Sequence, residues 1–140
     1  MTGKVHYEEL LPSEFEERLA HRALGYLPIG TLEWHGVQNA LGADFIQARG
    51  VFERAATRFG GIVFPPVWLG PDRTTAQDDG TSLIGMDTAD VTTPHRQLPG
   101  SCYWSPKGLF LQTVENILTQ AKRSGFACII ADGHGPSRGA

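Results

Sequence analysis

Glu33 and His35 are the residues whose types and spacing most strongly indicate chemistry. They lie two apart in the run Glu33-Trp34-His35-Gly36, directly after a predicted strand over residues 24–30. Residues two apart in an extended segment point to the same side, so both side chains can face one site. A carboxylate and an imidazole in this arrangement are both suitable metal ligands.

Two further residues extend this candidate site. Asp44 lies at the start of a predicted helix, and His134 follows the last predicted strand in the run 132–136 (DGHGP). In open α/β sheets, ligands bind outside the carboxyl ends of the strands, which is where both segments fall. One Glu, one Asp and two His make a nitrogen and oxygen ligand set that suits zinc or manganese.

Each of these residues also has a simpler interpretation. Asp44 could serve only to cap its helix, because a carboxylate is stabilised by the free backbone N–H groups there. Glu33 and His35 could belong to a surface turn. The glycine-rich residues 133–139 follow a strand as phosphate loops do, although they do not form a complete G-x-G-x-x-G motif.

Three aromatic residues are candidates for lining a substrate pocket, namely Trp68, Tyr103 and Trp104. Packing of loops against the core is the alternative role for these side chains. A cysteine nucleophile is a weak hypothesis, because His95 and Cys102 have no identifiable orienting partner in the sequence. No catalytic residue is therefore assigned.

The elements that must position these residues follow from periodicity and caps. Apolar stripes at three- and four-residue steps predict helices, and short apolar runs predict buried strands. The expected helices cover 13–22, 44–59 and 106–123, and the expected strands cover 24–30, 62–64 and 127–131. The first helix is expected to have Ser13 as N-cap and Glu16 at N3, and the third is expected to have Ser105 as N-cap. Pro28 indicates either an edge strand or a strand that is about to end. Residues 67–105 show little periodicity.

Alternating helices and short apolar strands predict an α/β fold with a mostly parallel sheet. The 140 residues are one domain's worth, and no internal boundary is evident. A net charge of −3 argues against a nucleic-acid binder, and no segment is long and apolar enough to span a membrane. Cys128 lies in an apolar run and is expected to be buried. With no signal peptide evident, we expect a cytoplasmic protein.

Five segments resemble the creatininase (creatinine amidohydrolase) family in the same order. The most specific is 27–36 (LPIGTLEWHG) followed by 41–44 (LGAD), which is similar to the family's L-P-x-G-S-x-E-x-H-G and L-G-x-D signature. Segments 64–66 (FPP), 98–101 (LPGS) and 132–135 (DGHG) resemble later blocks. The resemblance therefore covers nearly the whole chain.

This resemblance implies a three-layer α/β/α fold and a two-metal hydrolase. Asp44 would bridge two divalent ions, zinc or manganese or one of each. Glu33 and His134 would complete one site, and His35 would belong to the other. A metal-activated water would attack the carbonyl carbon and break the C–N bond of a small cyclic amide or related amide. The resemblance also implies a homo-oligomer, often a hexamer.

Two departures from the family pattern matter. In creatininase a glutamate two residues after the histidine of the last block binds the second metal, and here that position is Pro136. Family members are also considerably longer, so we expect this single domain to be truncated, lacking the family's C-terminal part. Two alternatives therefore stay open: the same scaffold hydrolysing a carbocyclic ketone, or a non-catalytic binding or assembly module that has lost part of the site.

Overall fold

The fold is a three-layer α/β/α arrangement, as expected. The computed structural model describes residues 3–88 and 100–140, and the statements below refer to these residues. The helices are α1 (Pro12–His21), α2 (Ala43–Phe59), α3 (Lys107–Arg123) and α4 (Gly135–Arg138), with 3-10 turns η1 (Tyr7–Glu9) and η2 (Gly85–Thr88). The strands are β1 (Leu24–Ile29), β2 (Ile62–Val63), β3 (Thr74–Ala76), β4 (Ser82–Ile84) and β5 (Cys128–Gly133).

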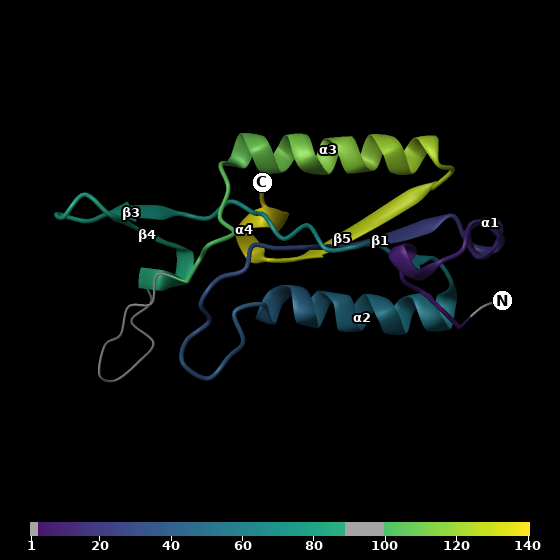
Figure 1. Cartoon of the computed structure of the whole chain (residues 1–140), viewed down its shortest axis with the longest axis horizontal. Coiled ribbons are helices and arrows are strands. Elements are labelled where there is room, and N and C mark those ends of the chain that lie inside the picture. The colour runs from purple at the N-terminus through teal and green to yellow at the C-terminus, as the bar shows by residue number, and fades with distance from the viewer. Residues whose placement is uncertain (1–2, 89–99) are drawn as a thin grey trace.

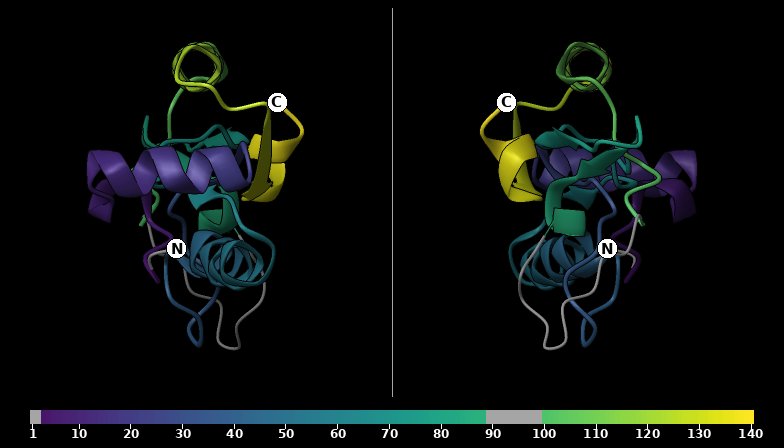
Figure 2. Two further views of the ribbon diagram at one scale, coloured as in Figure 1. Left: turned by 90° about the vertical axis from the view of Figure 1, so that its right-hand side faces the viewer. Right: turned by 90° about the vertical axis from the view of Figure 1, so that its left-hand side faces the viewer.

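The main sheet has the order β2-β1-β5, and its strands are parallel. β5 runs in register with β1 from the pair Leu24–Cys128 to the pair Ile29–Gly133. Helix α2 covers one face of the sheet and α3 lies on the other (Figures 1 and 2). Because parallel strands end at the same edge, the segments that follow β1 and β5 emerge together.

The two predicted apolar stripes form the core. Helix α2 buries Ala48, Phe52 and Ala56 against one face of the sheet, where Tyr26 and Val63 lie. On the other face, the cluster around α3 contains Leu27, Ile29, Val67 and Phe110. Alternate residues of β1 therefore serve opposite faces, which anchors this strand between both helical layers.

Of the two readings of Pro28, the edge strand is wrong, because β1 is the central strand, and the strand end is confirmed, because β1 ends at Ile29. The neighbouring strand β2 ends at Val63. The residues that follow it continue alongside β1, where the Phe64 N–H donates to Tyr26 O and the Val67 N–H donates to Pro28 O. The position of Pro28 thus requires an acceptor and no backbone donor, which proline satisfies.

Both predicted N-caps are displaced. Helix α1 begins at Pro12, and the Glu14 carboxylate accepts the Leu11 N–H at 2.8 Å, so Ser13 and Glu16 are not its cap. Proline is suited to the first helical position because its φ is already helical. Pro106 rather than Ser105 occupies the N-cap position of α3, and the buried Ser105 hydroxyl makes no hydrogen bond to the described residues.

Cys128 is exposed, so its predicted burial is wrong. The reason is the position of β5, which pairs with β1 along one edge and, within the described ranges, with no strand along the other. Ile130 on the same strand is 45% exposed. An apolar run therefore indicates a strand but does not indicate which of its sides is covered.

The stretch 67–105 contains more structure than its lack of periodicity suggests. Strands β3 and β4 form an antiparallel hairpin that projects from the body (Figure 1), and η2 follows it. His95 and residues 98–99 of the block resembling the family lie outside the described residues. In the described portion of the chain, no helix has the length and apolar character needed to cross a membrane.

Candidate metal centre

The four predicted ligands lie at the carboxyl edge of the sheet. Glu33 and His35 belong to the loop that leaves β1, Asp44 lies in the first turn of α2, and His134 directly follows β5. A hydrogen bond from the Glu33 N–H to Leu41 O closes the loop before α2 begins. Strand order and this loop closure bring three separate segments to one place.

The four predicted ligands and one further residue, Asp72, form two groups of donor atoms that share Glu33. In the first, His35 Nε2 lies 3.8 Å from Glu33 Oε1 and 3.3 Å from Asp44 Oδ2. In the second, His134 Nε2 lies 3.0 Å from Glu33 Oε1 and 3.1 Å from Asp72 Oδ2. Within each group, donor atoms of the three residues lie within 4.8 Å of one another.

Both histidines present the same ring nitrogen to the carboxylates. His35 Nδ1 lies 3.1 Å from Glu33 O, a carbonyl that can only accept, so Nδ1 carries the proton. The Ser137 hydroxyl donates to Gly30 O and must therefore accept from His134 Nδ1, 3.1 Å away. In the neutral rings Nε2 thus keeps its lone pair, as a metal-ligating histidine requires.

Asp72 was not among the residues singled out from the sequence. It lies in the segment that follows β2, directly after Gly70 and Pro71, and its side chain is 9% exposed. The signal that was available is an acidic residue after a Gly-Pro turn that follows a strand. That signal is weak, because neither its distance along the chain nor any periodicity connects it with Glu33.

Backbone from η2 covers the two buried carboxylates. The Met86 N–H donates to Glu33 Oε2 at 3.2 Å. Gly85 has φ +53°, and a Cβ at this position would collide with carboxylate oxygens of both Glu33 and Asp72. Glycine is therefore required for the close approach, and the lack of a side chain lets the backbone shield this side of the site.

The charges in the second group perturb one another. Burial alone would raise the pKa of Glu33, but hydrogen bonds with His134, Asp72 and the Met86 N–H hold that pKa below its usual value. The pKa of Asp72 is raised by burial and by the neighbouring Glu33. Burial would lower the pKa of His134, yet its contact with Glu33 and the nearby negative charges raise it.

This donor set fits divalent metal ions. Glu33 and Asp72 place two carboxylates in contact in a buried site, an arrangement that requires protons or a cation between them. Carboxylate oxygens and imidazole nitrogens are ligands that zinc and manganese accept. The resemblance implies that Asp44 is the shared ligand, whereas Glu33 is the residue common to both groups in the described residues.

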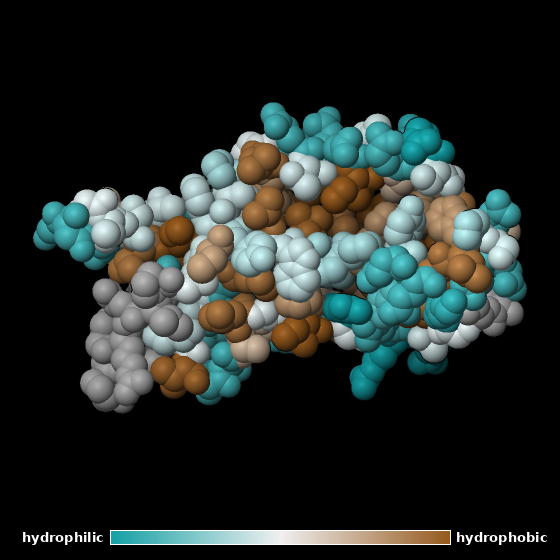
Figure 3. Space-filling view, viewed as in Figure 1, coloured by the Kyte–Doolittle hydropathy of each residue, from teal (hydrophilic) through white to brown (hydrophobic). Residues whose placement is uncertain are grey.

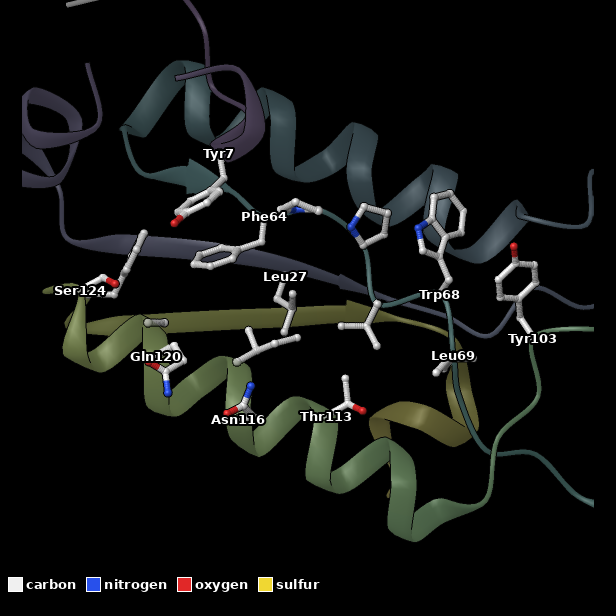
Figure 4. Close-up of a pocket in the computed structure, with 16 residues that line it drawn as sticks. Tyr7, Leu27, Phe64, Trp68, Leu69, Tyr103, Thr113, Asn116, Gln120 and Ser124 are labelled. Atoms are coloured by element: carbon white, nitrogen blue, oxygen red, sulfur yellow. The ribbon is translucent and has the colours of Figure 1, made fainter. Parts of the chain in front are cut away.

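The three aromatic candidates divide between two places. Trp68 and Tyr103 line an apolar groove of about 660 Å³ between α3 and the segment that follows β2 (Figure 4). The space-filling view shows apolar side chains gathered in a hollow below α3 (Figure 3). Trp104 instead donates its indole N–H to Asp72 O at 3.1 Å, so it holds the backbone of Asp72 and does not line the groove.

A separate cavity of about 640 Å³ adjoins two of the candidate ligand carboxylates. Glu33 and Asp72 contribute to its wall. The cationic side chains Arg73 and Lys107 also line it, as does Pro136 of α4. This cavity, rather than the apolar groove, gives a small molecule direct access to the carboxylates.

Comparisons with known proteins place this geometry in context. The family model named creatininase, described as creatinine amidohydrolase, matches residues 8–138. A comparison with curated protein sequences gave no match. Among solved structures, the chain is similar to a creatinine amidohydrolase (creatininase) at 25% identity and TM-score 0.71, over 95% of this chain and 46% of that one.

Two mutant creatininase structures are similar to the same extent. One is complexed with creatine, at 26% identity and TM-score 0.69, over 94% of this chain and 45% of that one. The other is described as Zn-Zn type, at 25% identity and TM-score 0.67, over 91% of this chain and 44% of that one. The chain therefore spans less than half the length of these structures.

Proposed function

The chain belongs to the creatininase family, and on that premise we propose that it acts as a metal-dependent hydrolase of a C–N bond in a small cyclic amide. The proposed cofactors are two divalent ions, zinc or manganese or one of each. The proposed ligands are Glu33, His35, Asp44 and His134. Neither the ketone hydrolase nor the non-catalytic module is favoured by the family match or the fold.

One observation carries this proposal: His35 Nε2 and His134 Nε2 lie 3.8 Å and 3.0 Å from the same oxygen, Glu33 Oε1, at the edge where ligands bind in α/β sheets. When bound, a divalent ion lowers the pKa of a coordinated water to about 7 and polarises a carbonyl. The chain's own contribution is orientation. Ser137 and the Glu33 carbonyl hold the two imidazoles with Nε2 directed at the carboxylates.

The adjoining cavity supplies the place for substrate. Its volume of about 640 Å³ suits a small molecule, and Glu33 and Asp72 lie in its wall. The backbone of Gly85 and Met86 covers the carboxylates on another side and limits access by bulk water. A substrate in this cavity would lie against the metal ligands.

Asp44→Asn tests the proposal. Since Asp44 belongs only to the group that contains His35, we expect the number of zinc or manganese ions bound per chain to fall from two to one. Hydrolysis of creatinine and related lactams should fall at least about 100-fold, because even a residue behind a metal ligand can be worth that much. Metal content by mass spectrometry and a product assay measure both effects.

Asp78→Asn is the matched control, since Asp78 is an exposed aspartate and undergoes the same chemical change. It should retain wild-type metal content and activity. The proposal is wrong if the wild-type chain binds neither ion after loading, or if Asp44→Asn retains both ions and full activity.

We also propose that the chain forms a homo-oligomer through the outer edge of β5. In support, Ile130 is 45% exposed on this strand, and apolar strand edges favour pairing with another copy. Light scattering should give a mass that is a multiple of 15.2 kDa, and Ile130→Lys should shift it toward the monomer. A wild-type mass of one chain at micromolar concentration would contradict this.

A further inference from the structure

We propose that Asp72 is a metal ligand, so that the site containing Glu33 and His134 holds its ion with two carboxylates and one imidazole. This inference rests on the proposed function, because it requires a metal-binding chain. It adds a residue from a part of the sequence that contributes none of the other ligands.

The first support is position. Asp72 Oδ2 lies 3.1 Å from His134 Nε2, the nitrogen that also lies 3.0 Å from Glu33 Oε1. Three donors, one from each residue, lie within 4.8 Å of one another, close enough to share one ion. The side chain of Asp72 is 9% exposed, so it is directed into the site rather than into solvent.

The second support is that the Asp72 carboxylate is held in place. Its Oδ1 accepts the Arg73 N–H at 2.6 Å, and its backbone oxygen accepts the Trp104 indole N–H at 3.1 Å. With one carboxylate oxygen engaged in this way, Oδ2 remains directed toward His134. A ligand that is ordered before the ion arrives loses less entropy on binding.

The third support is charge. Glu33 and Asp72 are two carboxyl groups that each lie within 3.1 Å of one imidazole nitrogen, in a region that Gly85 shields from water. Protonated imidazole supplies at most one positive charge, whereas a divalent ion supplies two. Buried carboxylates are stable when paired with a cation of this kind.

Asp72 is not needed to orient His134. The Ser137 hydroxyl already fixes the ring through Nδ1, and Ser137 is itself held by Gly30 O. Asp72 and Glu33 both approach the other nitrogen, Nε2, which is the ligating atom. The contact of Asp72 with His134 therefore lies on the ligand side of the ring.

The test compares Asp72→Asn with the wild-type chain in titrations with Zn²⁺ and with Mn²⁺, followed by calorimetry and mass spectrometry. We expect one of the two sites to bind at least about tenfold more weakly, with the other unchanged. Asp78→Asn, again the exposed control, should behave as wild type. The visible absorption spectrum of the Co²⁺-loaded chain should differ from that of the wild type in Asp72→Asn and should match it in Asp78→Asn.

Thermal unfolding separates a ligand from a structural residue. Without metal, Asp72→Asn should unfold at the wild-type temperature or higher, because the variant removes a repulsion between carboxylates. Saturating Zn²⁺ should then raise its Tm by less than it raises that of the wild type. A structural role would instead lower the metal-free Tm and leave the metal-dependent increase unchanged.

Unchanged affinity, stoichiometry and Co²⁺ spectrum in Asp72→Asn would overturn the inference and leave the proposed function intact. A lowered metal-free Tm with an unaltered metal-dependent increase would also overturn it. Failure of the proposed function has a different signature, which is a wild-type chain that binds no metal at all.

Discussion

Glu33→Gln is expected to remove both metal ions and at least about 99% of any hydrolytic activity. Among the described residues, Glu33 is the one that belongs to both donor groups, and its side chain is 5% exposed. Glutamine keeps the size of the side chain but replaces an anionic ligand with a neutral amide, one end of which is a donor. Each ion would therefore lose a charged ligand at the same time.

The fold should survive this substitution. Asp72 remains beside His134 as a counter-charge, and the amide oxygen of the introduced glutamine can still accept the Met86 N–H. Circular dichroism should therefore match the wild type, while metal content measured by mass spectrometry falls from two ions toward none. Activity measured on creatinine and other lactams should fall in parallel.

Glu115→Gln is the control, since Glu115 is an exposed glutamate on α3. It should keep wild-type metal content. If Glu33→Gln retained two ions, the shared-ligand geometry would be wrong. If it lost one ion only, Glu33 would serve a single group and Asp44 would be the better candidate for the shared ligand.

Gly133→Ala is expected to cause the largest loss of stability. Gly133 has φ +147°, and a Cβ at this position would collide with the backbone oxygen of Ile29 in the paired strand. Forcing the strands apart and straining this backbone should lower the free energy of unfolding by about 3 kcal/mol or more. A chain of this size should then unfold about 10 °C lower.

The same substitution should weaken metal binding. His134 is the next residue, and its N–H donates to Ile29 O, the very atom that the new methyl group would displace. Urea unfolding followed by fluorescence measures the stability, and calorimetry measures the metal affinity. Both should fall together, because the backbone of Ile29 contacts Gly133 at the end of the paired strands and also accepts the N–H of His134.

Gly135→Ala is the matched control two residues away. A Cβ at this position would meet nothing within 4 Å, and its φ is not in the positive range that favours glycine. Its effect on stability should stay within about 0.5 kcal/mol. Equal stability of the two variants would show that the Gly133 contact does not constrain the fold.

Local patterns in the sequence were sufficient for the main elements and for four candidate ligands. The stripes of α2 and α3 are visible because helical periodicity repeats along the chain. Glu33, His35, Asp44 and His134 were identified from residue type, two-residue spacing and position at element ends, features that are all local. The structure brings these four together, although their roles as ligands stay predictions.

Other features were beyond local patterns. Helix caps moved by one or two residues, since α1 begins at Pro12 with Leu11 as its N-cap and α3 has Pro106 rather than Ser105 as its N-cap. The burial of Cys128 was predicted wrongly, because an apolar run does not reveal whether its strand lies at the edge of a sheet.

Motifs and periodicity along the chain were sufficient for the family, the layered fold and the edge of the sheet where the candidate site lies. Tertiary packing was needed to bring Asp72 and Gly85 to Glu33 and to make Glu33 common to both groups. These contacts join residues far apart in the sequence through strand order and a loop crossing. No local pattern in the sequence predicts these contacts, because they depend on how the intervening strands and turns pack.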